Sequence, residues 1–442
     1  MKMKTRAGFL LLATTCLLNY SCKKETEHPG NNGEHQQAKT YSSDVVVKWL
    51  YMDLDLFRVP LAAGAASQGP DRVYAYAGIA AYESIVNGMP AYQSLSGQLK
   101  DFPAMPATQP GKAYNWAICA NAALASMHKK LFPAASADNI TKMSHLEDSL
   151  LLVFSENADA AVIQRSVEYG QSIATKVFDW AASDGSANVN PPYVPPVGPG
   201  LWVPTAPTPP ANPYAAQRRI LVTGDDNGAT LDPPPAYSTE PTSAFYAMVK
   251  DVYDKSLVLT DDQKAMAVYH RDAPGYPIGG HFASILANVL TKANPDLDKG
   301  VLAYVKMGIA FHDAGLHCFV KKYQINQVRP ITYIQNVMGL TTWAPVIPTP
   351  NHPEFPSAHA VNSSAVAVAL TDAIGDNFSF TDNTYDYLGL PARNFTSFKH
   401  MCTEMAQSRV YAGIHYQASC DKGLVYGEKI AKNILSILKF KK

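Results

Sequence analysis

The strongest constraint on the fold is a proline-rich segment near the middle of the chain. Residues 191–213 contain ten prolines in 23 positions. Proline lacks a backbone N–H and clashes with the preceding turn, so this segment cannot form a regular helix or an inner strand. Trp202, Tyr193 and Tyr214 indicate that the segment packs against the protein body. Two interpretations stay open: a covering loop over about 183–245, or a loop that shapes the mouth of a pocket.

Helical periodicity dominates on both sides of this loop. Apolar residues recur near every 3.6 positions in an N-terminal region, 43–260, and again in a C-terminal region, 261–442. We therefore predict an all-α fold, a helical bundle or a pair of bundles that can form one compact domain. The main expected helices cover 72–84, 113–131, 146–180, 299–322, 357–374, 398–413 and 424–438. Asp261 is expected to cap a helix that runs to His270, and 377–395 to form a short hairpin.

Composition excludes some classes of partner. The 442 residues are 47% hydrophobic and 17% charged, which is typical of a globular protein. Lys plus Arg and Asp plus Glu number 37 each, so overall charge gives no reason to expect nucleic acid or an anionic membrane surface as partner. Any functional positive charge must be local. The oligomeric state stays open, a homodimer included.

The N-terminus is typical of an exported protein. Basic residues precede an apolar run, 7–18, that is too short to span a bilayer, so 1–22 is interpreted as a signal peptide. Ser21-Cys22 resembles a bacterial lipoprotein cleavage site. We therefore expect a lipid anchor at Cys22 in the outer membrane or periplasm, with ordinary secretion as the alternative. Residues 23–42 are interpreted as a flexible tether.

Four cysteines remain outside the leader: Cys119, Cys318, Cys402 and Cys420. Export permits disulfides, but sequence alone cannot fix a pairing. A bridge between Cys402 and Cys420 is one expectation, and buried free thiols are the other.

Three segments concentrate cationic and imidazole side chains. Lys322 is expected at the end of a helix and is followed by Arg329-Pro330 after a break. The second segment is His352-Pro-Glu-Phe-Pro-Ser-Ala-His359. In the third, Ser408-Arg409 is followed by His415 after five residues.

These residue types suit an oxyanion. Ser357 follows a proline and is expected at a helix N-terminus, where free N–H groups and the helix dipole favour anions. Arginine forks match tetrahedral oxyanions, and lysine adds a point charge. Arg409 and His415 can face one site only if their helix ends near Gly413 and His415 lies on the following turn.

The three segments together resemble the superfamily of vanadium-dependent haloperoxidases and type 2 phosphatidic acid phosphatases. Its signature is Lys, six residues, Arg-Pro; then Pro-Ser-Gly-His; then Ser-Arg, five residues, His, three residues, Asp. The match covers 322–421, with weaker similarity around 72–84 and 272–282. The resemblance implies a helical bundle of that type and a vanadate or phosphate site. The residues implied as binding groups are Lys322, Arg329, Ser357, Ala358, His359, Arg409 and His415.

Two positions depart from the signature. Ala358 replaces glycine, so its methyl group can crowd a close oxygen. The aspartate expected four residues after His415 is replaced by Ser419, and the nearest aspartate is Asp421. Either Asp421, Ser419 or a main-chain carbonyl is then expected to orient the His415 ring.

The haloperoxidase resemblance implies a role for each residue. His415 binds vanadium, the cationic residues hold the vanadate oxygens, and Lys322 polarises bound peroxide. His359 moves protons, and halide is oxidised by hydrogen peroxide while vanadium acts as a Lewis acid. His352 resembles an imidazole placed beside vanadate in related enzymes, although a capping role is equally open. Phe319 resembles an aromatic position near the halide, or is simply a core residue.

The phosphatase resemblance uses the same pocket for a phosphomonoester. His415 then attacks phosphorus to form a phosphohistidine, and His359 protonates the leaving oxygen. The length of the chain and the lack of later 18-residue apolar runs favour the haloperoxidases, with bromide or iodide as substrate. A third interpretation, an anion-sequestering protein, has no use for His359. His312, Asp313 and His317 are expected to be structural.

Overall fold

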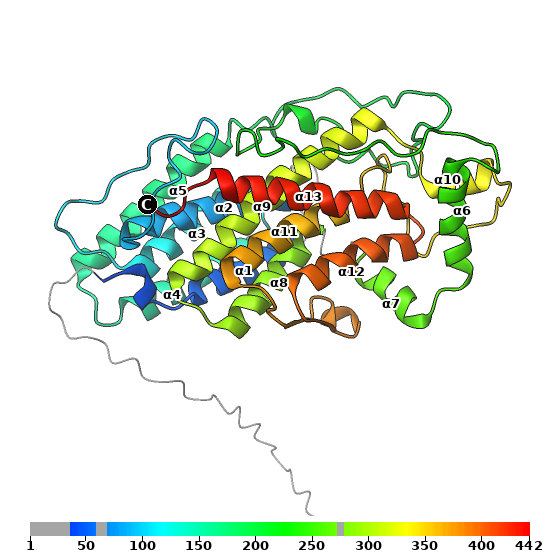
Figure 1. The fold of residues 1–442 in the computed structure, drawn as a ribbon. Helices are drawn as coiled ribbons and strands as arrows, with labels where there is room; N and C mark the ends of the chain where they lie inside the picture. Colours follow the sequence, from blue (N-terminus) through cyan, green and yellow to red (C-terminus); the bar gives the residue numbers. More distant parts are fainter. Residues whose placement is uncertain (1–35, 59–68, 272–277) are drawn as a thin grey trace, which may run out of the picture. The chain divides into compact units, whose positions relative to one another are not determined.

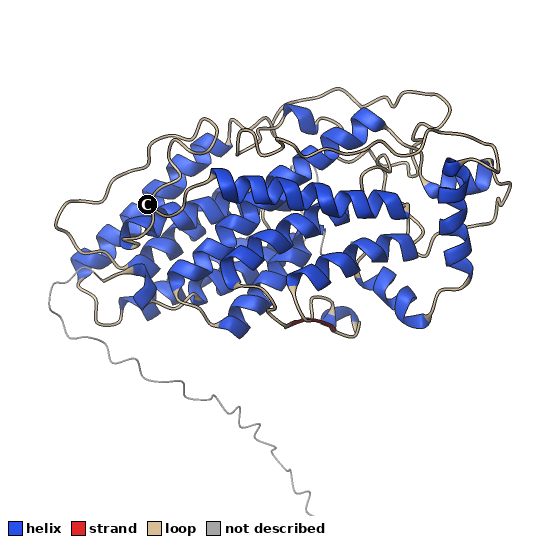
Figure 2. Ribbon diagram, in the orientation of Figure 1, coloured by secondary structure: helices blue, strands red, loops and turns tan. Residues whose placement is uncertain are grey.

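The protein is a helical bundle. The computed structural model describes residues 36–58, 69–271 and 278–442, which belong to one compact unit, and Figure 2 shows that helices dominate them. The α-helices of this part of the chain are α1 (Asp44–Arg58), α2 (Pro70–Ile85), α3 (Trp116–Leu131), α4 (Ala137–Ser155), α5 (Ala160–Ala181), α6 (Ala244–Leu257), α7 (Asp261–Tyr269), α8 (Ile278–Ala293), α9 (Leu297–Ile325), α10 (Pro330–Asn336), α11 (Ala358–Ile374), α12 (Phe398–Tyr411) and α13 (Gln417–Ile437). The predicted all-α fold is confirmed.

Helix α9 is the centre of the bundle. It packs against α2 on one side and against α11 on another, and α11 in turn packs against α13 (Figure 1). The α2–α9 crossing is very close: a Cβ atom at Gly308 would lie only 2.3 Å from the Tyr74 carbonyl oxygen. At the α11–α13 crossing, a Cβ atom at Gly427 would lie 2.0 Å from the Val361 carbonyl oxygen. Glycine at these two points lets the backbones approach and fixes α9, α11 and α13 relative to one another.

The element boundaries differ from the sequence-based prediction in several places. The helix predicted over 146–180 is two helices, α4 and α5, separated at residues 156–159. Thr260, not Asp261, caps α7, because its hydroxyl and the Gln263 side chain form a reciprocal capping box. Helix α13 begins at Gln417, well before the predicted start at residue 424. The predicted hairpin is present as β1 (Phe380–Asp382) paired antiparallel with β2 (Arg393–Phe395).

The proline-rich loop packs against the connections that follow α9 and precede α11. The Trp202 N–H donates to the Asn326 carbonyl at 2.8 Å, and the Val328 N–H donates to the Gly200 carbonyl at 2.9 Å. The Ala211 N–H donates to the Asn351 carbonyl at 3.1 Å. Trp202 is 1% exposed. The loop therefore covers the turn between Lys322 and Arg329 and the residue before His352.

Cys119, Cys318, Cys402 and Cys420 are all free and buried. The expected bridge between Cys402 and Cys420 is therefore wrong. Burial raises the pKa of Cys402 to about 11 and of Cys420 to about 12, so these thiols are protonated at neutral pH and behave as small apolar side chains.

Several expectations concern residues that the structure does not describe. The signal peptide, Cys22 and most of the expected tether lie outside the described residues, as does most of the similar text in 272–282. Within the described ranges, no helix has the length and apolar character needed to cross a membrane.

Candidate active site

The N-terminus of α11 forms one wall of the site. Ser357 is its N-cap residue, with its hydroxyl 3.5 Å from the Ala360 N–H. The backbone N–H of Ser357 donates to the Ser419 carbonyl at 3.3 Å, which ties this end of the helix to α13. Ala358 is 2% exposed and belongs to the main hydrophobic core. The first turn of α11 therefore presents backbone N–H groups and the positive end of a helix dipole.

Lys322 lies on the last turn of α9 and is fully buried. The helix ends at Asn326, whose φ of 53° is left-handed, and this turn separates Lys322 from Arg329. The Nζ atom donates to the carbonyls of Pro353 and Glu354, both at 2.9 Å. An ammonium group has three donors, so one stays for a ligand. Burial and the nearby Arg329 lower the pKa of Lys322 to about 7.

Arg329 is the N-cap residue of α10 and joins two of the segments. Its Nε atom donates to the His352 carbonyl at 2.9 Å, and Nη1 donates to the Ile414 carbonyl at 2.8 Å. The same Nη1 lies 3.1 Å from His415 Nε2. Because a guanidinium can only donate, Nε2 of His415 accepts this bond and carries a lone pair.

Glu354 orients His415. The Nδ1 atom of His415 lies 2.7 Å from Glu354 Oε1, and this oxygen also accepts from the Tyr416 N–H at 3.0 Å. With Nε2 accepting from Arg329, Nδ1 carries the proton and donates to the carboxylate. Burial and Arg329 lower the pKa of His415 well below its usual range, so the ring is neutral.

The hypothesis that Asp421 orients His415 is therefore wrong. Asp421 is exposed, and its Oδ1 accepts from Gln417 on the surface of α13. Ser419 does not contact the imidazole either; its hydroxyl lies beside Glu354 and lowers the pKa of that carboxyl. Glu354 is the acidic residue within the second segment, three positions before Ser357. A carboxylate inside this segment was the feature of the sequence that could have indicated the partner of His415. The superfamily signature instead places an aspartate after His415.

Arg409 and His359 meet at the backbone of His270. Arg409 is 1% exposed on the last turn of α12, and its Nη1 donates to the His270 carbonyl. The backbone of His270 also interacts with the His359 ring. Burial, then Arg409, lowers the pKa of His359 well below its usual range. The ring is thus a neutral base beside a buried cation. The structure therefore brings all the residues of the predicted cage to one end of the bundle.

Known proteins resemble both a C-terminal segment and most of this chain. Residues 303–440 match a family model described as the VCPO second helical-bundle domain. A solved structure described as the first bacterial vanadium-dependent iodoperoxidase shares 30% sequence identity with a TM-score of 0.79, covering 91% of this chain and 98% of that one. This chain belongs to the vanadium-dependent haloperoxidase family.

Two further structures share the haloperoxidase fold at lower identity. They are the apo and holo forms of a bacterial vanadium-dependent chloroperoxidase, each 18% identical to this chain, with TM-scores of 0.64 and 0.62. The apo form covers 87% of this chain and 96% of its own, and the holo form 92% and 94%. A search of curated proteins finds no match.

The charge of this haloperoxidase site fits the vanadate that the family binds. Lys322, Arg329 and Arg409 are each no more than 1% exposed. Lys322 and Arg329 lie close to Glu354, a buried carboxyl group whose pKa burial raises to about 7. Buried cations are costly, and a bound oxyanion would stabilise Lys322 and Arg329. His415 Nε2, as an unprotonated imidazole nitrogen, suits the metal centre.

His352 lies inside the cage. Arg329 Nη2 donates to its Nδ1 at 2.9 Å, and its ring meets the edge of Phe319 at a centroid distance of 5.3 Å. Burial, then Lys322, lowers the pKa of His352 well below its usual range. The pair therefore forms a neutral, partly apolar wall next to the cations.

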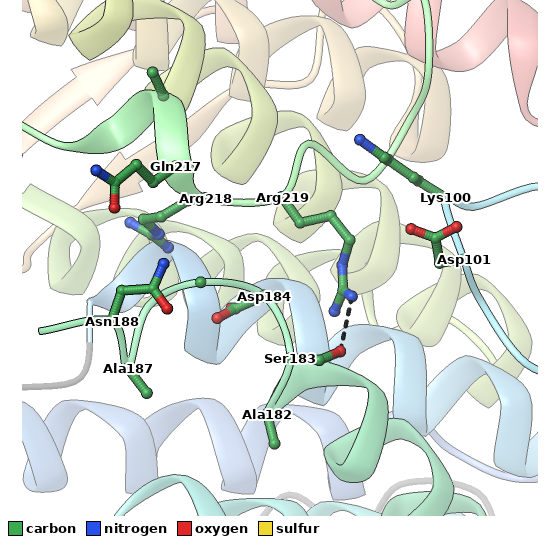
Figure 3. A pocket seen from close by; sticks show the side chains of 12 residues that line it. Lys100, Asp101, Ala182, Ser183, Asp184, Ala187, Asn188, Gln217, Arg218 and Arg219 are labelled. Atoms are coloured by element: carbon green, nitrogen blue, oxygen red, sulfur yellow. Dashed lines mark hydrogen bonds between the residues drawn. The ribbon is translucent and has the colours of Figure 1, made fainter.

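A separate hollow of about 450 Å³ is lined by none of the signature residues (Figure 3). Arg218 on its wall pairs with Asp71 at 2.6 Å, and Arg219 donates to the Ser183 hydroxyl at 3.1 Å. Asp101 and Asp184 also line the hollow, so carboxylates lie beside its cationic side chains.

A pair of substitutions separates the two candidate orienting residues. Glu354→Gln keeps the shape of the side chain but removes the charge that stabilises the Nδ1–H tautomer of His415. We expect vanadate affinity to fall by about 10–100-fold, as measured by titration of the apoprotein. Asp421→Asn is the matched control and should bind like the wild type; the reverse ranking would contradict this assignment.

The pKa of Lys322 predicts a pH effect on binding. Below about pH 7 the ammonium is charged and attracts vanadate, and above it the charge is lost from the apoprotein. The affinity ratio of wild type to Lys322→Met should therefore shrink by about tenfold per pH unit above pH 7. Vanadate's own titration is common to both proteins and cancels in the ratio. A ratio that stays constant from about pH 6 to about pH 9 would contradict the shifted pKa of Lys322.

Proposed function

We propose that this protein is a vanadium-dependent haloperoxidase that oxidises iodide in preference to bromide or chloride, with hydrogen peroxide as oxidant. The observation that carries the proposal is the neutral His415 ring, held through Nδ1 by Glu354 and placed next to the buried Arg329 and Lys322. The kinship with a protein described as an iodoperoxidase supports the choice of halide.

Each residue has a distinct task. His415 Nε2 would be the protein ligand of the metal once Arg329 Nη1 no longer donates to it. The guanidinium groups of Arg329 and Arg409 would hold the surrounding oxygens with the remaining donor of Lys322. The Ser357 hydroxyl and the Ala358 N–H complete the oxyanion contacts at the start of α11. Vanadate bound there supplies a Lewis acid that activates hydrogen peroxide without changing its oxidation state.

His359 is the proton carrier. Its ring is neutral because burial and Arg409 disfavour the imidazolium form. A neutral imidazole can accept a proton from hydrogen peroxide as that molecule binds, and can return it to the departing oxygen. His352 and Phe319 provide a wall of low polarity, which suits a large, weakly hydrated halide such as iodide better than chloride.

Vanadate and phosphate have similar shape and charge, so phosphate should compete for the same cage. Hydrolysis of a phosphomonoester through a phosphohistidine at His415 is the second candidate function. The kinship with haloperoxidases makes it the weaker of the two. It would use the same residues, and a direct assay separates the two activities.

The test is a paired assay of halide oxidation and phosphomonoester hydrolysis. Vanadate-loaded protein should oxidise iodide fastest, phosphate should inhibit loading, and His415→Ala should abolish the activity because the metal loses its protein ligand. His145→Ala, which removes an exposed imidazole on α4, is the matched control and should stay active. Phosphomonoester hydrolysis without halide oxidation, or full activity of His415→Ala, would overturn the proposal.

We also propose that the protein is exported and anchored by lipid at Cys22. The basic start, the short apolar run and Ser21-Cys22 support this proposal. Mass spectrometry of the mature protein should find an acylated Cys22 as its first residue. A free N-terminus at another position would contradict the anchor.

A further inference from the structure

A second cluster of potential metal ligands lies between α9 and the loop of residues 221–228, outside the haloperoxidase cage. His317 Nε2 is 2.8 Å from Asp225 Oδ1, and Asp226 follows in the same loop. One potential ligand atom from each of these three residues lies within 4.8 Å of the other two. We propose that Asp225, Asp226 and His317 bind a divalent transition-metal ion, with Zn²⁺ as the probe.

The buried carboxylate of Asp225 is the observation that points to a ligand. Asp225 is 1% exposed, and its Oδ2 has no hydrogen-bond partner in the described part of the chain. A buried carboxylate oxygen without a partner is costly, so a group that occupies it stabilises the fold. Nearby donors are engaged elsewhere: the Leu221 and Val222 N–H groups both donate to Asp313, one turn before His317, at 2.9 Å.

The carboxylates are not needed to hold their own loop. Asn433 on α13 donates through Nδ2 to the backbone carbonyls of Asp225 and Asn227, at 2.7 and 2.8 Å. These bonds and those to Asp313 fix the loop backbone against α9 and α13. Main-chain contacts thus hold Asp225 and Asp226 close to His317, and Oδ2 of Asp225 is available for another partner.

The charge of this cluster favours a cation. Asp225, Asp226 and Asp313 bring three carboxyl groups close to one imidazole, and burial raises the pKa of Asp225 to about 6, with Asp313 adding to the effect. A bound cation would relieve both the burial and the repulsion.

The ligand set selects the class of metal. One imidazole nitrogen with carboxylate oxygens suits Zn²⁺ or Mn²⁺, whereas Mg²⁺ and Ca²⁺ prefer oxygen ligands alone. The ion would replace the proton shared by His317 Nε2 and Asp225 Oδ1, so binding releases one proton. Asp226 is exposed and His317 only partly buried, which gives the ion a path from solvent.

The expected role is a clamp between the 221–228 loop and α9. His317 lies five residues before Lys322 on the same helix. A metal at this position would hold the end of α9 that carries the catalytic lysine. The clamp is independent of the chemistry at His415.

The experiment compares metal retention and thermal stability in full-length variants. Wild type is first stripped of metal with a chelator, then loaded with Zn²⁺ and dialysed. It should retain one Zn²⁺ per chain and melt at a higher temperature than the stripped protein. Asp226→Asn changes an exposed side chain and should fold, but its affinity should fall by about tenfold or more. His317→Gln should also lose the ion, while His145→Gln, an exposed imidazole on α4, should not.

Zinc bound adventitiously by the active-site imidazoles would persist in Asp226→Asn, so the difference between the proteins isolates this cluster. Equal retention by wild type and Asp226→Asn would overturn the proposal. So would a wild type that retains no zinc and shows no change in melting temperature with Zn²⁺. Neither result depends on whether the protein oxidises halide.

Discussion

The structure depends on the burial of three cationic side chains around the start of one helix. Lys322, Arg329 and Arg409 are almost completely removed from water, and the buried Glu354 carboxyl group lies close to Lys322 and Arg329. Burial of Lys322 beside Arg329 is unfavourable, because both groups lose contact with water and repel each other. A bound oxyanion would stabilise both cations. The lowered pKa of Lys322 reflects its burial and the nearby Arg329, whereas the raised pKa of Glu354 reflects burial, which outweighs the lowering effect of the two cations.

Close contacts between helices hold these buried cationic side chains in place. Glycines at the two crossings, Gly308 and Gly427, bring α2, α9, α11 and α13 into direct backbone contact. The helices then stop abruptly where the site requires it. Asn326 terminates α9 just after Lys322. Gly413, with φ of 78°, turns the chain just after α12, and this turn directs His415 back to the cage. The proline-rich loop covers the turn at Asn326.

Much of the cage could be predicted because its three segments resemble the superfamily signature, and helix geometry is consistent with their spacing. Six residues separate Lys322 from Arg329, and this interval spans a helix end and one turn. The six-residue step from Arg409 to His415 likewise required a helix that ends near Gly413, and α12 does end there. Ser357 after Pro356 predicted the N-terminus of α11 correctly.

The support of His415 could not be predicted, because it comes from another segment. Glu354 reaches the ring only after α9, the covering loop and α11 have placed the second segment beside the third. The sequence left Asp421, Ser419 and a main-chain carbonyl as candidates near His415, and Asp421 is exposed. The Cys402–Cys420 bridge failed for a similar reason: the two residues bracket the third segment in sequence, yet both thiols are free and buried in the helical packing.

The central claim is that His415, held by Glu354, presents an unprotonated Nε2 to an oxyanion enclosed by Lys322, Arg329 and Arg409. A crystal structure of the protein soaked with vanadate tests this claim most directly. The account predicts vanadium bonded to Nε2 of His415, with Nδ1 still donating to Glu354 and with the three cations around the oxygens. Vanadate bound elsewhere, or a His415 ring that has left Glu354, would contradict it.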